Sequence, residues 1–315
     1  MNNAHTLLTN SRHGLRALAT ALVVFASTAV FASTPAGHFE KSLSVNGPVN
    51  LEVLTRSGNV TVRAGSPGSV FIRGKIFVGD SWLFGGRQGD VHAIEQNPPI
   101  HQDGNSVHID YVSERNISID YEITVPADTS VRSHSGSGDQ IVEGTHGNLE
   151  VQTGSGDVRL ANLSGEVRLQ TGSGDIRGHG VSGAVTGGTG SGNVEIEEAG
   201  TGDLDLHTGS GNIHVRGIQG AFRGEAGSGD ITAEGAQTGS WDIHTGSGTV
   251  SVRLPGNAAY DADIATSSGS IDLNSPIEMT VQGRVEETRR HIRGKVRGGG
   301  PSLSIRTGSG DIRVQ

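Results

Sequence analysis

Acidic side chains recur at regular spacing along this chain, directly after copies of the tripeptide Gly-Ser-Gly. In a stack of repeated units, residues at equivalent positions become neighbours about 4.8 Å apart, so these carboxylates would form a column. Carboxylate oxygens are the ligands that Ca²⁺ prefers, and such a column could hold calcium ions. The aspartates of this calcium-ladder hypothesis are Asp139, Asp157, Asp175 and Asp230.

The second interpretation of the column is that each side chain accepts hydrogen bonds from turn amides. It explains why Asn193, Asn212 and Thr249 stand at equivalent positions. The known calcium-binding solenoid pattern places one residue between the last glycine and the aspartate, whereas Asp157 follows Gly156 directly. The sequence therefore favours turn capping, and it predicts no metal ion and no cofactor.

Histidine and serine offer two further chemistries. His207 and His244 hold equivalent positions before Thr-Gly-Ser-Gly, two repeats apart, with Glu225 between them. A spacing of roughly 9 to 10 Å is too wide for one zinc ion, whose nitrogen ligands lie near 2 Å. The serine is copied in every repeat and no helix follows it, unlike the nucleophile of a hydrolase elbow. We therefore expect no catalytic residue in the repeats.

Short strands must position these residues. Each unit of 18 or 19 residues has two similar halves, as Thr153–Leu160 and Leu163–Leu169 show, so a coil contains two turns and two strands. Within each strand apolar residues alternate with polar ones. The sequence predicts an all-β fold, a parallel β-solenoid with coils of about 18 residues. The copies of Gly-Ser-Gly begin at Gly136, Gly154, Gly172, Gly190, Gly209, Gly227, Gly246 and Gly308.

Three segments are expected along the chain. Residues 1–32 have the features of a signal peptide, because Arg12 and Arg16 precede a short apolar run. The run is about 15 residues long, shorter than the roughly 20 that cross a bilayer as a helix. Residues 33–132 are expected to form a β-rich N-terminal cap, and 133–315 the repeat solenoid. Export predicts a location in the periplasm or at the cell surface.

The composition of the chain excludes further classes of site and function. The chain has 315 residues, no cysteine and a formal net charge of -9. Without cysteine, neither disulfides nor thiolate metal sites can hold the fold together. The negative charge argues against a nucleic-acid binder, which needs a basic face to meet phosphate. An envelope protein or a surface polymer is the expected partner.

Two unrepeated segments are candidate interaction surfaces. Residues 80–99 break the alternation and are predicted to form a loop with aromatic side chains, including Trp82 and Phe84. A basic cluster near the C-terminus could touch an anionic envelope surface, since each basic group there contributes about 1 kcal/mol. A solvated pair of strands with interleaved charges is the alternative. The cluster consists of Arg284, Arg289, Arg290, Arg293, Lys295 and Arg297.

The chain resembles a known bacterial family, the adhesin-like domains of unknown function with β-strand repeats, similar to auto-transporter adhesin head domains. The carrying features are the strand Ile119–Pro126, the serial Thr-Gly-Ser-Gly-Asp/Asn units, and Gly298–Pro301 leading into the copy that ends with Ile312. The resemblance covers roughly Leu43 to Val314. It implies an exported β-solenoid without an established enzymatic activity, and it brings no catalytic residues.

Two functions from different classes follow. The first is a non-enzymatic structural or interaction module of the bacterial envelope, which would bind through the flat faces of the solenoid. The alternative is a carbohydrate-active enzyme, a polysaccharide lyase or hydrolase, because parallel β-helices can carry an acidic cleft. The carboxylates proposed for that enzyme are Asp103, Asp110, Asp120 and Glu122.

Overall fold

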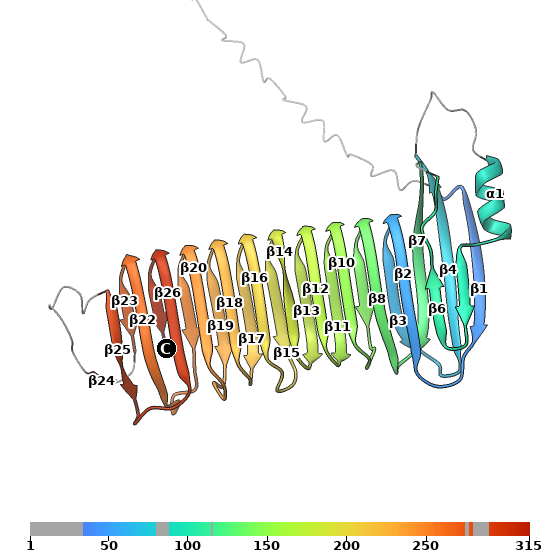
Figure 1. Ribbon diagram of the computed structural model, residues 1–315. Coiled ribbons are helices and arrows are strands. Elements are labelled where there is room, and N and C mark those ends of the chain that lie inside the picture. Colours follow the sequence, from blue (N-terminus) through green and yellow to red (C-terminus); the bar gives the residue numbers. More distant parts are fainter. Residues whose placement is uncertain (1–33, 80–87, 115, 275–276, 280–289) are drawn as a thin grey trace, which may run out of the picture. The chain divides into compact units, whose positions relative to one another are not determined.

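Two long β-sheets form the compact unit Thr34–Gln315, as the computed structural model shows (Figure 1). The structure describes residues 34–79, 88–114, 116–274, 277–279 and 290–315. Each coil gives one strand to each sheet, so the coil has two sides. The predicted all-β solenoid is confirmed. The predicted signal peptide lies outside the described residues, and no helix in the described part is long and apolar enough to cross a membrane.

The first sheet, sheet A, contains 13 strands, which are parallel through the repeats and antiparallel where β4 pairs with β1 and β7. In spatial order they are β1 (Gly37–Ser44), β4 (Ser69–Val78), β7 (Ile117–Pro126), β3 (Val60–Gly65), β9 (Gln140–Glu143), β11 (Val158–Ser164), β13 (Ile176–Ser182), β15 (Val194–Glu198), β17 (Ile213–Ile218), β19 (Ile231–Gly235), β21 (Val250–Arg253), β27 (Ile312–Val314) and β23 (Ile271–Leu273).

The second sheet, sheet B, contains 14 strands and has antiparallel pairs only at its two ends. In spatial order they are β5 (Ile100–Asp103), β6 (Ser106–Ile109), β2 (Val49–Ser57), β8 (Thr129–Ser137), β10 (Leu149–Ser155), β12 (Val167–Ser173), β14 (Val185–Ser191), β16 (Leu204–Ser210), β18 (Phe222–Ser228), β20 (Trp241–Ser247), β26 (Ser302–Ser309), β22 (Tyr260–Ser268), β25 (His291–Val296) and β24 (Ile277–Met279).

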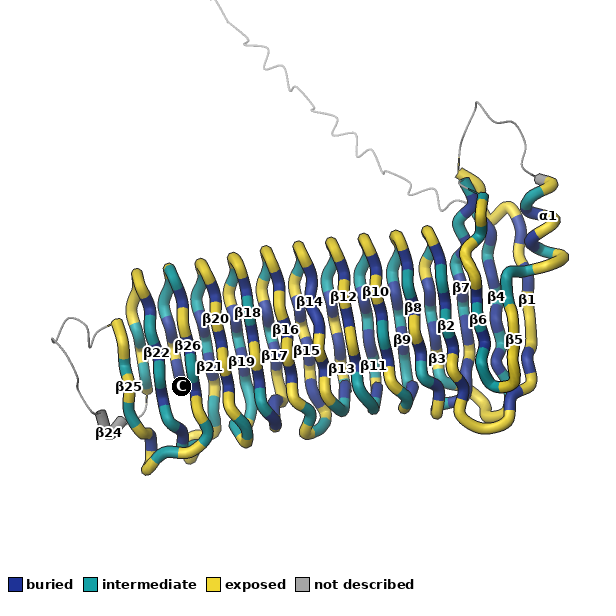
Figure 2. Tube along the Cα trace, in the orientation of Figure 1, coloured by how far each residue is buried: buried dark blue, intermediate teal, exposed yellow. Residues whose placement is uncertain are grey.

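A narrow apolar core runs between the sheets. Buried and exposed residues alternate along each strand, because successive side chains of a strand point to opposite faces (Figure 2). Equivalent residues of neighbouring coils pair in register, so the core consists of columns. In one column the rings of Phe222 and Trp241 meet edge to face at 5.9 Å. Gly224 makes room for them, because a Cβ there would lie 2.7 Å from the Phe222 ring.

The two ends of the stack share an unexpected topology. The last coil in sequence, β26–β27, lies between the coil β20–β21 and the strands β22 and β23 (Figure 1). At the other end, β2–β3 lies between β8–β9 and the strands β6 and β7. The segment 33–132 therefore supplies one coil of the stack as well as the strands that cover it. Each outermost strand is short or antiparallel, which suits an edge that must not pair further.

One prediction about the irregular segment is wrong. Part of residues 80–99 forms a helix, α1 (Gln88–Gln96), rather than a loop. Its buried residues Val91 and Ile94 face the same side, and Val91 packs against Gly37 of β1. Two apolar residues three apart are too weak a signal to predict a helix from sequence.

Candidate functional site

The acidic column is a hydrogen-bonded ladder between coils. The side-chain oxygen of each Asp or Asn accepts the backbone amide hydrogen of the equivalent residue in the next coil, as Asp157 does from Asp175 at 3.0 Å. The amide thus belongs to the neighbouring coil rather than to the residue's own turn. The ladder runs from Asp120 through Asn59, Asp139, Asp157, Asp175, Asn193, Asn212 and Asp230 to Thr249, with N···O distances of 2.7 to 3.1 Å.

Arginines neutralise three aspartates of this ladder, Asp139, Asp157 and Asp175. Arg159 donates to the carboxylates of both Asp139 and Asp157, and Arg177 forms ion pairs with Asp157 and Asp175. Burial alone would raise the pKa of Asp139, but hydrogen bonds from Arg159 and from the Asp157 amide lower that pKa below its usual value. The guanidinium of Arg159 therefore favours the ionised form of the Asp139 carboxyl group.

The glycines and threonine of the motif allow the coils to approach. Gly156 has a φ of +145°, and a Cβ there would lie 2.2 Å from the carbonyl oxygen of Gly138. On the inner side of the corner, Thr171 donates its hydroxyl hydrogen to the Gly156 carbonyl at 3.2 Å. The glycine and the threonine at this corner thus both bring one coil close to the next.

The acidic ladder offers little space for calcium. Its inner carboxylate oxygens already accept amide hydrogens, and arginine occupies the outer oxygens of Asp139, Asp157 and Asp175. Within the described residues, no group of three or more His, Asp or Glu side chains lies close enough to hold a metal ion. The geometry is that of hydrogen-bond capping from one coil to the next.

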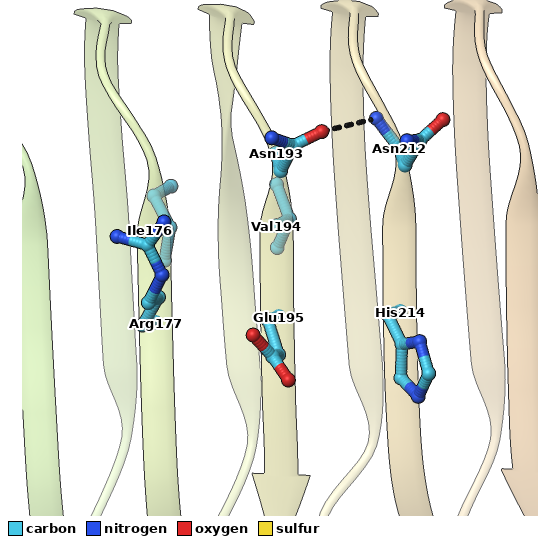
Figure 3. Close-up of a pocket in the computed structure, with 7 residues that line it drawn as sticks. All are labelled: Ile176, Arg177, Asn193, Val194, Glu195, Asn212 and His214. Atoms are coloured by element: carbon cyan, nitrogen blue, oxygen red, sulfur yellow. Dashed lines mark hydrogen bonds between the residues drawn. The ribbon is translucent and has the colours of Figure 1, made fainter.

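A hollow of about 280 Å³ interrupts the outward face of sheet A (Figure 3). It spans three coils, and its floor is formed by the buried residues Ile176 and Val194. The polar residues around it are Arg177, Asn193, Glu195, Asn212 and His214. Its upper rim is the ladder bond in which Asn193 Oδ1 accepts the amide hydrogen of Asn212 at 2.9 Å.

A change in the repeat creates the hollow. In the two preceding coils, the ladder aspartate is followed two residues later by arginine, whose long side chain turns back over the corner. Here asparagine takes the place of the aspartate, and Glu195 and His214 take the place of the arginines, as their register with Arg177 shows. The shorter side chains have no corner carboxylate to reach, so they leave the surface open.

The electrostatics of the hollow are dominated by Glu195. Arg177 is committed to Asp157 and Asp175, and none of the described residues forms an ion pair with Glu195. The Nε2 atom of His214 is buried and has no hydrogen-bond partner among the described residues. The hollow therefore presents one unneutralised, exposed carboxylate beside amide groups of the ladder. Such a site suits a cationic or hydrogen-bond-donating group.

Among the described residues, the histidines of sheet B belong to no group of three or more possible metal ligands. His207 and His244 are register partners of Glu225 on either side, which places them two coils apart as predicted. Glu225 forms its ion pair with Arg223 of its own strand at 2.5 Å rather than with either histidine. This row of side chains is an exposed polar face of the sheet.

The described part of the basic cluster is tied to the scaffold. His291 and Arg293 of β25 form ion pairs with Asp263 of β22, at 2.7 and 2.8 Å. Arg290 and Arg297 donate to backbone carbonyls of Ser267 and Gly256. Lys295 is exposed. Of the other predicted surface residues, Trp82, Phe84, Arg284 and Arg289 lie outside the described residues.

The four carboxylates proposed for a carbohydrate-active enzyme do not come together as a free pair. Asp120 belongs to the ladder and accepts the amide hydrogen of Asn59, while Glu122 forms ion pairs with Lys75 and Arg73. Asp110 lies 3.3 Å from His101. Asp103 is exposed on the edge strand β5 of sheet B, whereas Asp120 and Glu122 both belong to β7 of sheet A. Asp110, Asp120 and Glu122 thus have structural partners, and Asp103 lies on the other sheet from Asp120 and Glu122.

Comparisons with known proteins gave one family match and solved structures of low sequence identity. Residues 101–315 match the family Toastrack DUF4097. No curated protein matches the chain. A solved structure from Parabacteroides distasonis, called a "putative lipid binding protein", is 10% identical and covers 89% of this chain and 97% of its own, with a TM-score of 0.48. A "putative adhesin" from Bacteroides fragilis is 14% identical, with coverages of 88% and 97% and a TM-score of 0.37.

A third solved structure, a "putative cell adhesion protein" from Clostridium sporogenes, is 12% identical and covers 88% of this chain and 98% of its own, with a TM-score of 0.21. Similarity at this level tells nothing about what the present chain binds. The family match spans more than half of the sequence and includes all eight Gly-Ser-Gly copies. The chain belongs to the Toastrack DUF4097 family.

Proposed function

We propose that this protein is an exported, non-enzymatic interaction module of the bacterial envelope, which binds an envelope protein or a surface polymer through the outward face of sheet A. The observation that carries the proposal is the hollow around Glu195. The two preceding coils close the same surface with Asp–Arg pairs, whereas the coils of Glu195 and His214 leave it open.

The charge of the hollow indicates the chemistry of the contact. Glu195 is the unneutralised group, and the whole chain carries a net charge of -9. A cationic or amine-bearing group of the partner would gain an ion pair with Glu195 and hydrogen bonds to the ladder amides. Nucleic acid fits poorly, because its phosphates would meet a carboxylate.

The test uses a variant that closes the hollow by the chain's own pattern. Asn193→Asp combined with Glu195→Arg recreates the pair formed by Asp175 and Arg177. We expect this variant to bind isolated cell envelopes at least about tenfold more weakly than the wild type, a loss of roughly 1.4 kcal/mol. Asp205→Asn, on the outward face of sheet B, is the matched control and should bind normally.

Co-sedimentation with isolated envelopes and a glycan array provide the two measurements. Circular dichroism must show that both variants keep the wild-type fold. Equal binding by the double variant and the wild type would place the contact elsewhere. If the folded wild-type protein bound neither envelopes nor glycans, the interaction function itself would be refuted.

A further inference from the structure

A buried glutamate replaces an aliphatic residue inside the solenoid. At one corner of the core, Leu163 and Val181 are register partners in successive coils, and Val181 in turn pairs with Glu198. Ile218 ends β17 at the same corner of the following coil. These three apolar residues are at most 3% exposed and Glu198 is 7% exposed, so a carboxyl group occupies a place that apolar side chains fill elsewhere.

The carboxyl group of Glu198 is only half satisfied. Its Oε1 atom accepts the amide hydrogen of Gly202 at 2.7 Å, and its Oε2 atom is buried and has no hydrogen-bond partner among the described residues. The ionised form needs hydrogen bonds at both oxygens, and an unsatisfied buried charge is costly. A protonated carboxyl group fits this environment better than a carboxylate.

The backbone around Glu198 departs from that of the preceding coil. The register between β13 and β15 shifts between His179 and Val181, opposite Glu198. The chain then leaves β15 and forms an extra-long corner, residues 199–203, before β16 begins at Leu204. The bond from Gly202 to Glu198 closes this corner from inside, so the side chain holds the loop against the core.

The charged groups around Glu198 do not neutralise it. Asp203, in the same loop, is negative and opposes ionisation. On β13, His179 pairs with Glu197 at 2.6 Å, and on β17 the register partner of Glu197 is the exposed Arg216. Burial, opposed by the nearby backbone amides of Gly202 and Gln219, raises the pKa of Glu198 to about 7.

We propose that the carboxyl group of Glu198 is a proton-binding site that couples the corner loop, residues 199–203, to external pH. At acidic pH the protonated group stays in the core and the loop is closed. At alkaline pH the carboxylate draws water to Oε2, and the loop opens at one edge of the stack while the rest of the coil remains paired. This inference does not depend on the proposed binding function.

Hydrogen exchange measured by mass spectrometry tests the proposal on the whole protein at pH 5.5 and pH 8.5, with rates corrected for the intrinsic pH dependence of exchange. We expect protection of the segment 199–203 and of Gln219 to fall at least about tenfold at the higher pH, since one pKa unit of linkage is worth a factor of ten. Segments at the Gly-Ser-Gly corner of the same coil should keep their protection.

Two variants test whether protonation of Glu198, rather than another titrating group, changes the protection of the loop. Glu198→Gln mimics the protonated group and should stay protected at both pH values. Glu197→Gln, one residue away on the exposed face, should behave like the wild type. The proposal is overturned if wild-type protection is the same at both pH values, or if Glu198→Gln retains the wild-type pH dependence. Addition of Ca²⁺ at pH 8.5 should not restore protection, and restoration would indicate a cation site instead.

Discussion

The side-chain oxygen of Asn212 accepts the backbone amide hydrogen of Asp230, which stands at the same corner of the next coil, at 2.8 Å. Asn212 has no charge, so this bond can be tested without disturbing an ion pair. We expect Asn212→Ala to lower the free energy of unfolding by about 1 kcal/mol, the usual contribution of one hydrogen bond. Asn212→Asp retains the acceptor oxygen and should cost less.

Urea denaturation measures the difference. Ser210→Ala is the matched control, because this serine lies exposed at the same corner. Equal stability of Asn212→Ala and Ser210→Ala would show that the ladder bonds contribute nothing to the stack.

Much of this architecture is predictable from the sequence, because the Gly-Ser-Gly period and the alternation within strands give the coil and its core directly. The partner of each ladder residue is less predictable. Turn capping by Asp157 is a local inference, whereas the observed donor belongs to Asp175 in the next coil. The hollow was missed, although a signal exists in the sequence: Asp-x-Arg in two coils becomes Asn193-x-Glu195 and Asn212-x-His214 in the next two.

The order of the coils is harder still to predict. Nothing in the composition of Ser302–Gln315 tells that β26–β27 lies between β20–β21 and β22–β23, because all three coils offer the same pattern of apolar residues. The burial of Glu198 is equally hard to predict. Glu198 is an ordinary charged residue in the sequence, and only its register with Val181 shows that it points into the core.

A substitution at Gly156 tests whether adjacent coils need the close backbone contact seen at this corner. Its φ of +145° disfavours any side chain, and an added Cβ would lie 2.2 Å from the Gly138 carbonyl oxygen. We expect Gly156→Ala to destabilise the protein by about 2 to 3 kcal/mol, the cost of a strained backbone position. Ser155→Ala, one residue earlier and exposed, should be neutral in the same thermal melt. A melting temperature for Gly156→Ala equal to that of Ser155→Ala would contradict the packing of the corner.

The ion pairs of Asp263 make the stability of the C-terminal strands depend on pH. Burial would raise the pKa of Asp263, but hydrogen bonds from His291 and Arg293 and their charges lower it below its usual value. Because the folded pKa is depressed, the stabilisation is present above the unfolded pKa of about 3.9 and is lost as the pH falls through the folded value. Asp263→Asn should therefore lower stability at pH 7 by about 1 kcal/mol and have little effect near pH 2.

Stability curves in urea at the two pH values give the comparison. Asp272→Asn, an exposed aspartate of the edge strand β23, serves as the control and should change stability little at either pH. An equal loss at pH 2 and pH 7 for Asp263→Asn would mean that packing, rather than the ion pairs to β25, holds these strands together.

The coil β26–β27 joins the C-terminal strands to the repeats, so one core residue in it should control the whole end. Ile305 is fully buried and pairs with Ile243 on one side and Ile264 on the other. A charge at this position would have no partner in the core, and Ile305→Asp should displace the coil. The edges of β20 and β22 would then lose their shared neighbour, and the segment 254–274 would become sensitive to proteolysis while 149–235 stays resistant.

Ser302→Asp, at the exposed start of the same strand, should leave both segments resistant. If both segments of Ile305→Asp were cleaved equally, the stack would unfold as one cooperative unit, and the C-terminal strands would not unfold separately from the repeats.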